Sequence, residues 1–203
     1  SMLAEDLAPN RLERAKLAIR DCVEKLEGDR VGLVVFAGSS VVRCPLTVDY
    51  GFFRMMLDGV AVDSVTKGGT MIGDALRRVT TEVFDNQDRA FKDLILITDG
   101  QDHESFPLEA AKAVGEKGIR LLAIGLGDEK EGQPIPVTDN RNQRTFLTHD
   151  GEIVKTRLDG STLRDMVKAT PGGKYFNVAT GSMDLGAVYQ QLIAGAQKRS
   201  LQD

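Results

Sequence analysis

The chain has 203 residues, of which 41% are hydrophobic and 28% are charged, a composition typical of one globular domain with a substantial core. Its net charge of -4 and the lack of a basic stripe argue against a nucleic-acid-binding surface. No stretch approaches the roughly 18 consecutive apolar residues of a membrane-spanning helix. The 2 cysteines, Cys22 and Cys44, are too few for a disulfide framework. We interpret both as small buried hydrophobes, which leaves the redox compartment open.

The first half of the chain alternates helices with strands. A helix is expected between Asn10 and Gly28, because Glu13 lies three residues after Asn10, as in a capping box. Pro45 cannot donate to a strand ladder, so its strand is expected to be antiparallel and near an edge. The further elements predicted here are strands over 30–38 and 39–47, a helix that Asp49 begins, and a helix within 65–84 that follows a glycine-rich loop.

The second half continues the same rhythm with one departure. The run Leu94–Ile97 is apolar without alternation, so we expect this strand to be buried on both faces. Residues 134–157 depart from the rhythm, and Asp150-Gly151 predicts a β-hairpin turn within them. The other elements predicted here are a helix over 105–118, a strand over 119–127, a helix capped by Ser161, a strand over 174–179 and a helix over 182–199. Alternating strands and helices predict an α/β fold with a mostly parallel sheet that is covered on both faces.

The start of the chain does not fit this architecture. The first predicted element is a helix, which residues 1–10 enter without a strand. A doubly wound sheet normally begins with a strand that lies at its centre. We therefore expect the first strand to be missing from this chain.

Two short motifs are expected at the same edge of the sheet. Asp99 follows a buried strand directly, and the Gly68-Gly69-Thr70 loop opens a helix. Ligands of open α/β folds bind at the carboxyl ends of the strands, where both motifs would lie. The simpler alternatives are that Asp99-Gly100 only starts a turn and that Thr70 only caps its helix.

This combination of motifs resembles the von Willebrand factor type A domain. The metal-ion-dependent adhesion site of that family consists of an Asp-x-Ser-x-Ser motif after the first strand, a Thr in a Gly-Gly-Thr loop, and an Asp after the fourth strand. Thr70 and Asp99 match the last two parts, and Ser1 matches the final Ser of the first. The upstream Asp-x-Ser is absent, and Met71 stands where the family often has an acidic residue.

The resemblance extends over nearly the whole chain to the bacterial Bat aerotolerance proteins. It is carried by "SMLAEDLAPNRLERAK", "KGGTMIGDAL", "ITDGQDHE", "QPIPV" and "RLDGSTLRDMVKATPGGKYF". It implies a parent protein that is anchored in the bacterial inner membrane, with this domain facing the periplasm, and a role in stress or oxygen tolerance. Ser1 and Met2 are either native or an expression remnant followed by an initiator Met, and the run into the following residues favours a native pair.

For the fold, the resemblance implies a single domain over 1–203. The expected architecture is a three-layer, doubly wound, Rossmann-like sheet with one antiparallel edge strand and a β-hairpin insertion over 134–157. With the family strand order 3-2-1-4-5-6, the absent first strand would leave a gap between the strands at 30–38 and 94–97. Unpaired strand edges are costly. We expect the gap to be filled by a neighbouring copy or by residues 1–8, or the sheet to close up.

For function, the resemblance implies a metal-dependent protein-interaction module rather than an enzyme. Ser1, Thr70 and Asp99 would hold Mg²⁺ or Mn²⁺, and an exposed Asp or Glu of a protein partner would complete the coordination shell. Without the upstream Asp-x-Ser, the ion should bind weakly or not at all to this chain. Two alternatives remain open, namely a hydrolase that uses Asp99 and His103, and a metal-independent scaffold. The hydrolase is disfavoured because the sequence has no Gly-x-Ser-x-Gly motif.

Overall fold

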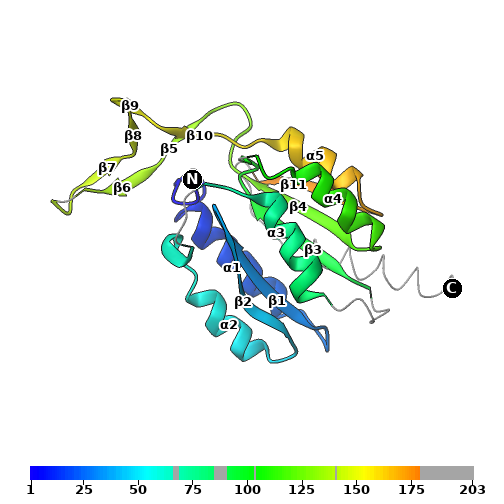
Figure 1. The fold of residues 1–203 in the computed structure, drawn as a ribbon. Helices are drawn as coiled ribbons and strands as arrows, with labels where there is room; N and C mark the ends of the chain where they lie inside the picture. The colour runs from blue at the N-terminus through cyan, green and yellow to red at the C-terminus, as the bar shows by residue number, and fades with distance from the viewer. Residues whose placement is uncertain (66–68, 85–90, 103, 140, 179–203) are drawn as a thin grey trace.

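The computed structural model describes residues 1–65, 69–84, 91–102, 104–139 and 141–178 (Figure 1). The described chain is a mixed α/β fold with three layers, as the alternation of strands and helices predicts. The helix expected over 182–199 lies outside the described residues. So does Gly68 of the glycine-rich loop.

The strands form two separate sheets in the body of the molecule. The larger is parallel, with the order β11-β4-β3, and the smaller is an antiparallel β1-β2 pair. Their bounds are β1 Val31–Phe36, β2 Ser40–Thr47, β3 Asp93–Thr98, β4 Arg120–Leu126 and β11 Lys174–Val178. The pairing of β2 slips near Pro45, where the register passes from Leu33↔Cys44 to Val31↔Thr47. Proline is tolerated at such a bulge because it has no N–H to offer the ladder.

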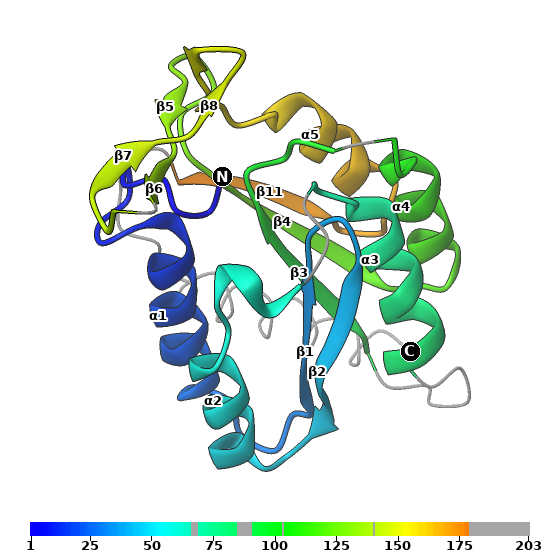
Figure 2. The same cartoon turned by 60° about the vertical axis from the view of Figure 1, so that its left-hand side comes forward.

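The helices lie on both sides of these sheets (Figure 2). Helices α3, α4 and α5 cover one face of the parallel sheet, and α1 covers the other. The helical elements are α1 Arg11–Val23, α2 Tyr50–Asp58, a 3₁₀ turn Val62–Ser64, α3 Ile72–Arg78, a π-helical turn Val79–Val83, α4 Pro107–Glu116 and α5 Gly160–Lys168. This arrangement confirms the predicted layers.

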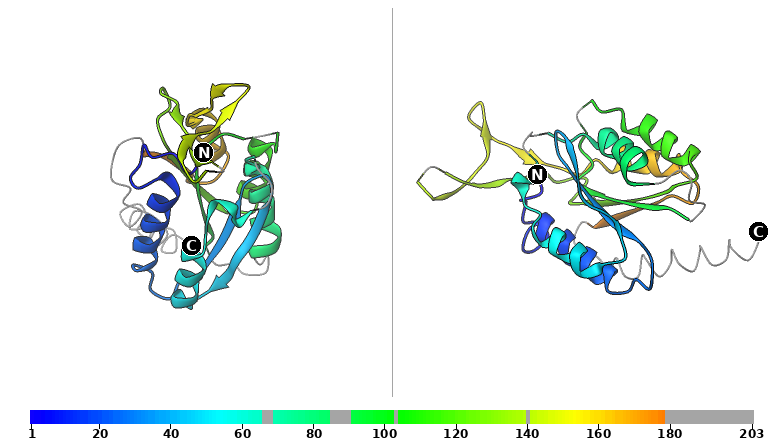
Figure 3. Two further views of the ribbon diagram at one scale, coloured as in Figure 1. Left: turned by 90° about the vertical axis from the view of Figure 1, so that its left-hand side faces the viewer. Right: turned by 60° about the horizontal axis from the view of Figure 1, so that its bottom comes forward.

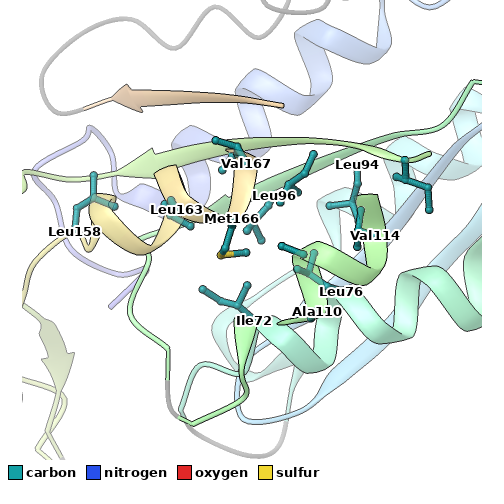
Figure 4. Packing of buried hydrophobic residues seen from close by; sticks show 14 residues of the cluster. Ile72, Leu76, Leu94, Leu96, Ala110, Val114, Leu158, Leu163, Met166 and Val167 are labelled. Carbon is teal, nitrogen blue, oxygen red and sulfur yellow. The ribbon is translucent and has the colours of Figure 1, made fainter. Parts of the chain in front are cut away.

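The main core lies between the parallel sheet and helices α3, α4 and α5 (Figure 4). Leu96 of β3 and Leu163 and Met166 of α5 are buried in it. A second cluster joins α1 to the opposite face of β4 and β11, through residues such as Ala18 and Ile124. Strand β4 is therefore buried along its whole length, as expected of a central parallel strand.

Local capping explains where most helices begin. The side chain of Asn10 accepts from the N–H of Glu13 at 2.9 Å, which confirms the predicted start of α1. Asp49 caps α2 in the same way, through the N–H of Phe52. The prediction for α5 is wrong by two residues, because Asp159, and not Ser161, is the N-cap. Helix α1 also ends at Val23, before the predicted stop at Gly28.

No strand lies between β1 and β3 in the described part of the chain, and the two sheets stay apart. A cavity of about 940 Å³ separates them, and β1, β3, α1, α2 and α3 contribute to its lining. Residues 1–8 form turns rather than a strand. Filling by these residues and closure of the sheet were thus wrong expectations. Filling by a neighbouring copy stays a prediction.

The burial of the two facing strands reflects this gap. All six residues of β1 are only half-buried, although its sequence is apolar throughout. In β3, Leu94 and Leu96 are buried, whereas Ile95 on the opposite face is 36% exposed. The expectation that β3 is buried on both faces is therefore wrong. Its second face borders the cavity instead of a packed layer.

A β-sheet arm extends from the body of the molecule near the N-terminus (Figure 3). It comprises β5 Gln133–Pro134, β6 Pro136–Thr138, β7 Arg144–Phe146, β8 Thr148–His149, β9 Glu152–Ile153 and β10 Lys155–Thr156, which pair as antiparallel hairpins. Asp150 and Gly151 have φ angles of 51° and 83°, the positive values that the predicted two-residue turn requires. Within the described residues, we find no helix with the length and apolar character needed to cross a membrane.

Candidate metal site at the carboxyl edge of the sheet

Asp99 lies directly after β3, at the carboxyl edge of the parallel sheet. It is only 2% exposed, so its carboxylate is almost fully removed from solvent. Its Oδ2 accepts from the hydroxyl of Thr156 at 3.0 Å and lies 3.5 Å from Nη1 of Arg11. A buried carboxylate needs such partners, because an unpaired buried charge is very costly.

Arg11 provides the positive charge beside Asp99. Its side chain is completely buried at the start of α1. Nε and Nη2 donate to the two carboxylate oxygens of Asp6 at 2.9 and 2.7 Å, which forms a bidentate pair. Nη1 is directed to Asp99 and to the hydroxyl of Thr156, which it reaches at 3.3 Å.

The sequence interpretation missed Arg11 as part of this site. The sequence contains one signal, because a positively charged arginine in the first turn of a helix is repelled by the positive end of the helix dipole. Such a placement is favourable only where carboxylates lie close by. Gly127, with a φ of 110°, makes room for the side chain, since a Cβ there would lie 2.3 Å from Nη2 of Arg11.

The loop after Asp99 is held against the segment that precedes α5. The carbonyl of Asp99 accepts from the N–H of Asp159 at 3.0 Å. Gly100 has a φ of 79°, and a Cβ at this position would lie 2.5 Å from the carbonyl oxygen of Asp159. Only glycine combines this backbone conformation with such a close approach.

Thr70 lies at the end of the glycine-rich loop, just before α3, and is partly buried. The N–H of Met71, its neighbour, donates to the carbonyl of Ala37 at 2.9 Å, which fixes the loop near the end of β1. Thr70 is not the cap of α3, because the N-cap position belongs to Met71. The alternative that Thr70 only caps its helix is thus not supported.

The first N–H groups of α3 are bonded from the loop after Asp99. Asp102 accepts from the N–H of Ile72 at 2.8 Å, and the hydroxyl of Ser105 accepts from the N–H of Gly73 at 2.7 Å. Asp102 also accepts from the N–H of Ser105 at 2.9 Å. The two motif-bearing loops are therefore joined by hydrogen bonds rather than only adjacent.

Ser1 lies close enough to Asp99 and Arg11 for their charges to act on its amino group. The pKa of this amino group lies below its ordinary value, mainly because of burial; the charge of Asp99 opposes this shift, and the charge of Arg11 adds to it. Ser1, Thr70 and Asp99 all border the cavity between the two sheets. Three of the residue positions singled out from the sequence thus share one cavity lining.

These residues fit some metals better than others. Two hydroxyls and one carboxylate are hard oxygen donors, which suit Mg²⁺ or Mn²⁺. Across the described ranges, no group of three or more His, Cys, Asp or Glu side chains is arranged to hold a metal ion. The donor set therefore fits a weakly held hard cation rather than a structural zinc ion or a carboxylate-rich calcium site.

The hydrolase alternative gains no support from the described histidine. His103 lies outside the described residues. His149 is in the β8-β9 hairpin of the arm, with its side chain 84% exposed. Its only described ionic contact, at 3.6 Å, is with Asp150 of the same turn.

Comparison with known proteins gives the family. Residues 1–101 match the model of the von Willebrand factor type A domain. The structure of BatB from Bacteroides thetaiotaomicron is 36% identical to this chain, with a TM-score of 0.87, and the match covers 97% of this chain and 94% of BatB. An aerotolerance-related membrane protein from Bacteroides fragilis is 33% identical, with a TM-score of 0.83, and the match covers 94% and 92% of the two chains.

A more distant likeness concerns the fold alone. The chain is 19% identical to proximal thread matrix protein 1 of the mussel byssus, with a TM-score of 0.62. The structure of that protein has zinc in its metal-ion-dependent adhesion site (MIDAS) motif. This match covers 88% of our chain and 40% of the byssus protein. The chain spans about half the length of the curated relatives it matches, such as a Nocardia farcinica protein of which it covers 58%. The chain belongs to the von Willebrand factor type A domain family and is similar to its bacterial BatB and aerotolerance-related members.

Proposed function

We propose that this domain binds a protein partner through a divalent cation at the carboxyl edge of the sheet. Ser1, Thr70 and Asp99 would hold Mg²⁺ or Mn²⁺, and an exposed Asp or Glu of the partner would be the further ligand. The observation that carries this proposal is that three hard-oxygen residues from separate segments border one cavity.

The charge of the donor set supports binding rather than catalysis. A single carboxylate would leave a bound divalent ion with surplus positive charge, and this charge is the chemistry that attracts an anionic partner residue. The chain's own contribution is to hold the ligands in place. The loop of Asp99 is fixed by Asp159, and the loop of Thr70 is fixed by Ala37.

The relatives support parts of this proposal. The mussel byssus protein is described with zinc in its adhesion-site motif, which is consistent with metal binding in this fold. The Bacteroides fragilis relative is described as a membrane protein, and we propose that the parent of this chain is membrane-associated too, with the domain in the periplasm. We also propose a role in aerotolerance, because the Bacteroides fragilis relative is described as aerotolerance-related.

Calorimetric titration of Mg²⁺ and Mn²⁺ into the 203-residue chain tests the cation site. We expect weak binding that is abolished in Asp99→Ala. Asp63→Ala is the matched control, because Asp63 is an exposed carboxylate in the 3₁₀ turn. Binding that survives in Asp99→Ala would show that the cation binds elsewhere.

A metal-independent scaffold is the second candidate, and one observation favours it. Asp99 already has buried Arg11, shared with Asp6, as a cationic partner at 3.5 Å, so the carboxylate does not depend on a metal for a partner. Under this alternative, neither the thermal stability nor partner binding responds to Mg²⁺ or to a chelator. The titration above separates the two candidates.

A further inference from the structure

We propose that Arg11 is the internal counter-cation of Asp99. It neutralises the carboxylate when no divalent ion is bound, and a bound ion replaces it in that role. The second half of this inference rests on the proposed function, whereas the first half concerns only the residues of the chain. Arg11 is thus a positioning residue that acts on the site through Asp99.

The first half, that Arg11 is the counter-cation of Asp99, rests on the burial of both side chains. Arg11 is 0% exposed and Asp99 is 2% exposed, so water can stabilise neither charge. Charges interact more strongly away from water, and a buried carboxylate such as that of Asp99 would be strongly unfavourable without a cationic partner. The Nη1–Oδ2 distance of 3.5 Å makes each of them part of the other's electrostatic environment.

The second half, that a bound ion replaces Arg11, rests on how the guanidinium is shared between Asp6 and Asp99. Asp6 holds Arg11 by two short hydrogen bonds of 2.9 and 2.7 Å. The contact with Asp99 is longer, at 3.5 Å, and therefore weaker. Arg11 can keep its bidentate pair with Asp6 while Asp99 changes partner, so the replaceable contact is the one at the candidate metal site.

The surroundings of Arg11 are specific to this side chain. Gly127, at the end of β4, leaves the space that the guanidinium occupies. Thr156 at the base of the arm contacts both Nη1 of Arg11 and Oδ2 of Asp99. The end of β4 and the base of the arm thus cover the pair on the sides away from the cavity that Asp99 borders.

Thermal unfolding in the presence of a chelator tests the first half. We expect Arg11→Met to lower the melting temperature, and Asp99→Asn added to it to restore part of the loss, because it removes the unpaired charge. Arg11→Lys keeps the positive charge, so adding Asp99→Asn to it should lower the melting temperature further. This reversal of sign is the diagnostic result, since a purely structural Arg11 predicts the same effect of Asp99→Asn in both backgrounds.

A variant that fails to fold still gives an interpretable result. If Arg11→Met alone fails to fold, folding of the Arg11→Met/Asp99→Asn double variant supports the pairing. If the double variant also fails while Arg11→Met/Asp6→Asn folds, Asp6 is the true partner and the inference is overturned. If none of these folds, the inference stands only where Asp99→Asn lowers the melting temperature of Arg11→Lys, and otherwise it falls.

Titration with MnCl₂ tests the second half. Removing a positive charge from beside the site should tighten Mn²⁺ binding in Arg11→Met on the order of tenfold relative to the wild type. Mn²⁺ should also raise the melting temperature of Arg11→Met more than that of the wild type. If Arg11→Met fails to fold, Arg11→Gln takes its place, and Arg11→Met folded by the addition of Mn²⁺ alone would itself support the exchange.

Failure of the exchange at Arg11 and failure of the proposed function give different results. Mn²⁺ binding that needs Asp99 but is unchanged in Arg11→Met contradicts the exchange and leaves the proposed function intact. A sign reversal in chelator together with no Mn²⁺ binding to any variant contradicts the proposed function and confines Arg11 to the counter-cation role.

Discussion

The hydroxyl of Thr156 donates to Oδ2 of Asp99 at 3.0 Å, and so joins the base of the arm to the loop after β3. Thr156 is 1% exposed, so its loss cannot be compensated fully by water. We expect Thr156→Val to lower the free energy of unfolding by about 1.5–3 kcal/mol, because a hydrogen bond to a buried charged group is lost. Urea denaturation measures this difference.

Thr148→Val is the matched control for that substitution. Thr148 lies in β8 of the same arm and is exposed, so the same change should alter stability by less than about 0.5 kcal/mol. Equal losses in both variants would mean that the effect comes from the arm as a whole and not from the hydrogen bond to Asp99.

The contact between Gly100 and Asp159 gives a second prediction. Gly100→Ala combines a positive φ of 79° with a Cβ that would lie 2.5 Å from the Asp159 carbonyl oxygen. Left-handed backbone costs a non-glycine residue about 1–2 kcal/mol, and the steric overlap adds about 1–3 kcal/mol more. We therefore expect a markedly lower melting temperature, which calorimetry or circular dichroism can measure.

Gly118→Ala separates the two contributions. Gly118 has a similar φ of 70°, but nothing lies within 4 Å of a Cβ built there. This variant should show only the backbone cost. A loss as large as that of Gly100→Ala would rule out the close approach to Asp159 as the cause.

Much of the fold could be predicted because its signals are local. Asn10 and Asp49 each cap the helix that their sequence context indicates. The start of α5 was less predictable, because Asp159 and Ser161 are both good N-cap residues and lie two positions apart. In the structure Asp159 is the cap, and its N–H also donates to the carbonyl of Asp99, which is a tertiary contact.

The burial of β1 and β3 could not be predicted from their composition. A continuous apolar run indicates a strand with both faces covered, but coverage also depends on which neighbours are present. Ile95 is in such a run and is still 36% exposed, because its face borders the cavity. The same limit applies to the site: a sequence motif predicts Thr70 and Asp99, whereas buried Arg11 contradicts the usual preference of arginine for the surface.

The third prediction concerns the pH dependence of stability through Glu129. Its carboxylate accepts from Arg164 at 2.5 Å, Tyr175 at 3.0 Å and Asn177 at 2.8 Å. The hydrogen bond from Arg164 is the main cause that lowers the pKa of Glu129 below its ordinary 4.5, although burial opposes it. A carboxyl whose pKa is lower in the folded state stabilises the fold above its ordinary pKa, and this stabilisation is lost as the pH falls through the folded value.

Glu129→Gln should therefore be less stable than the wild type at pH 7, with a difference that shrinks once the pH falls below the ordinary value of 4.5. Urea denaturation across this range measures the difference. Glu116→Gln, at an exposed position at the end of α4, is the control and should follow the wild type. A constant difference between Glu129→Gln and the wild type at all pH values would contradict the assignment.

The gap beside β3 makes the fourth prediction, which compares two neighbouring residues. Leu96 is 4% exposed and packs in the main core, whereas Ile95 points to the other face and is 36% exposed. We expect Leu96→Ala to cost about 2–5 kcal/mol, as in other buried sites, and Ile95→Ala about 1 kcal/mol. If instead Ile95→Ala costs as much as Leu96→Ala, its face is covered in solution. A cost that grows with protein concentration would identify the covering partner as a second copy of the chain, because only association depends on concentration.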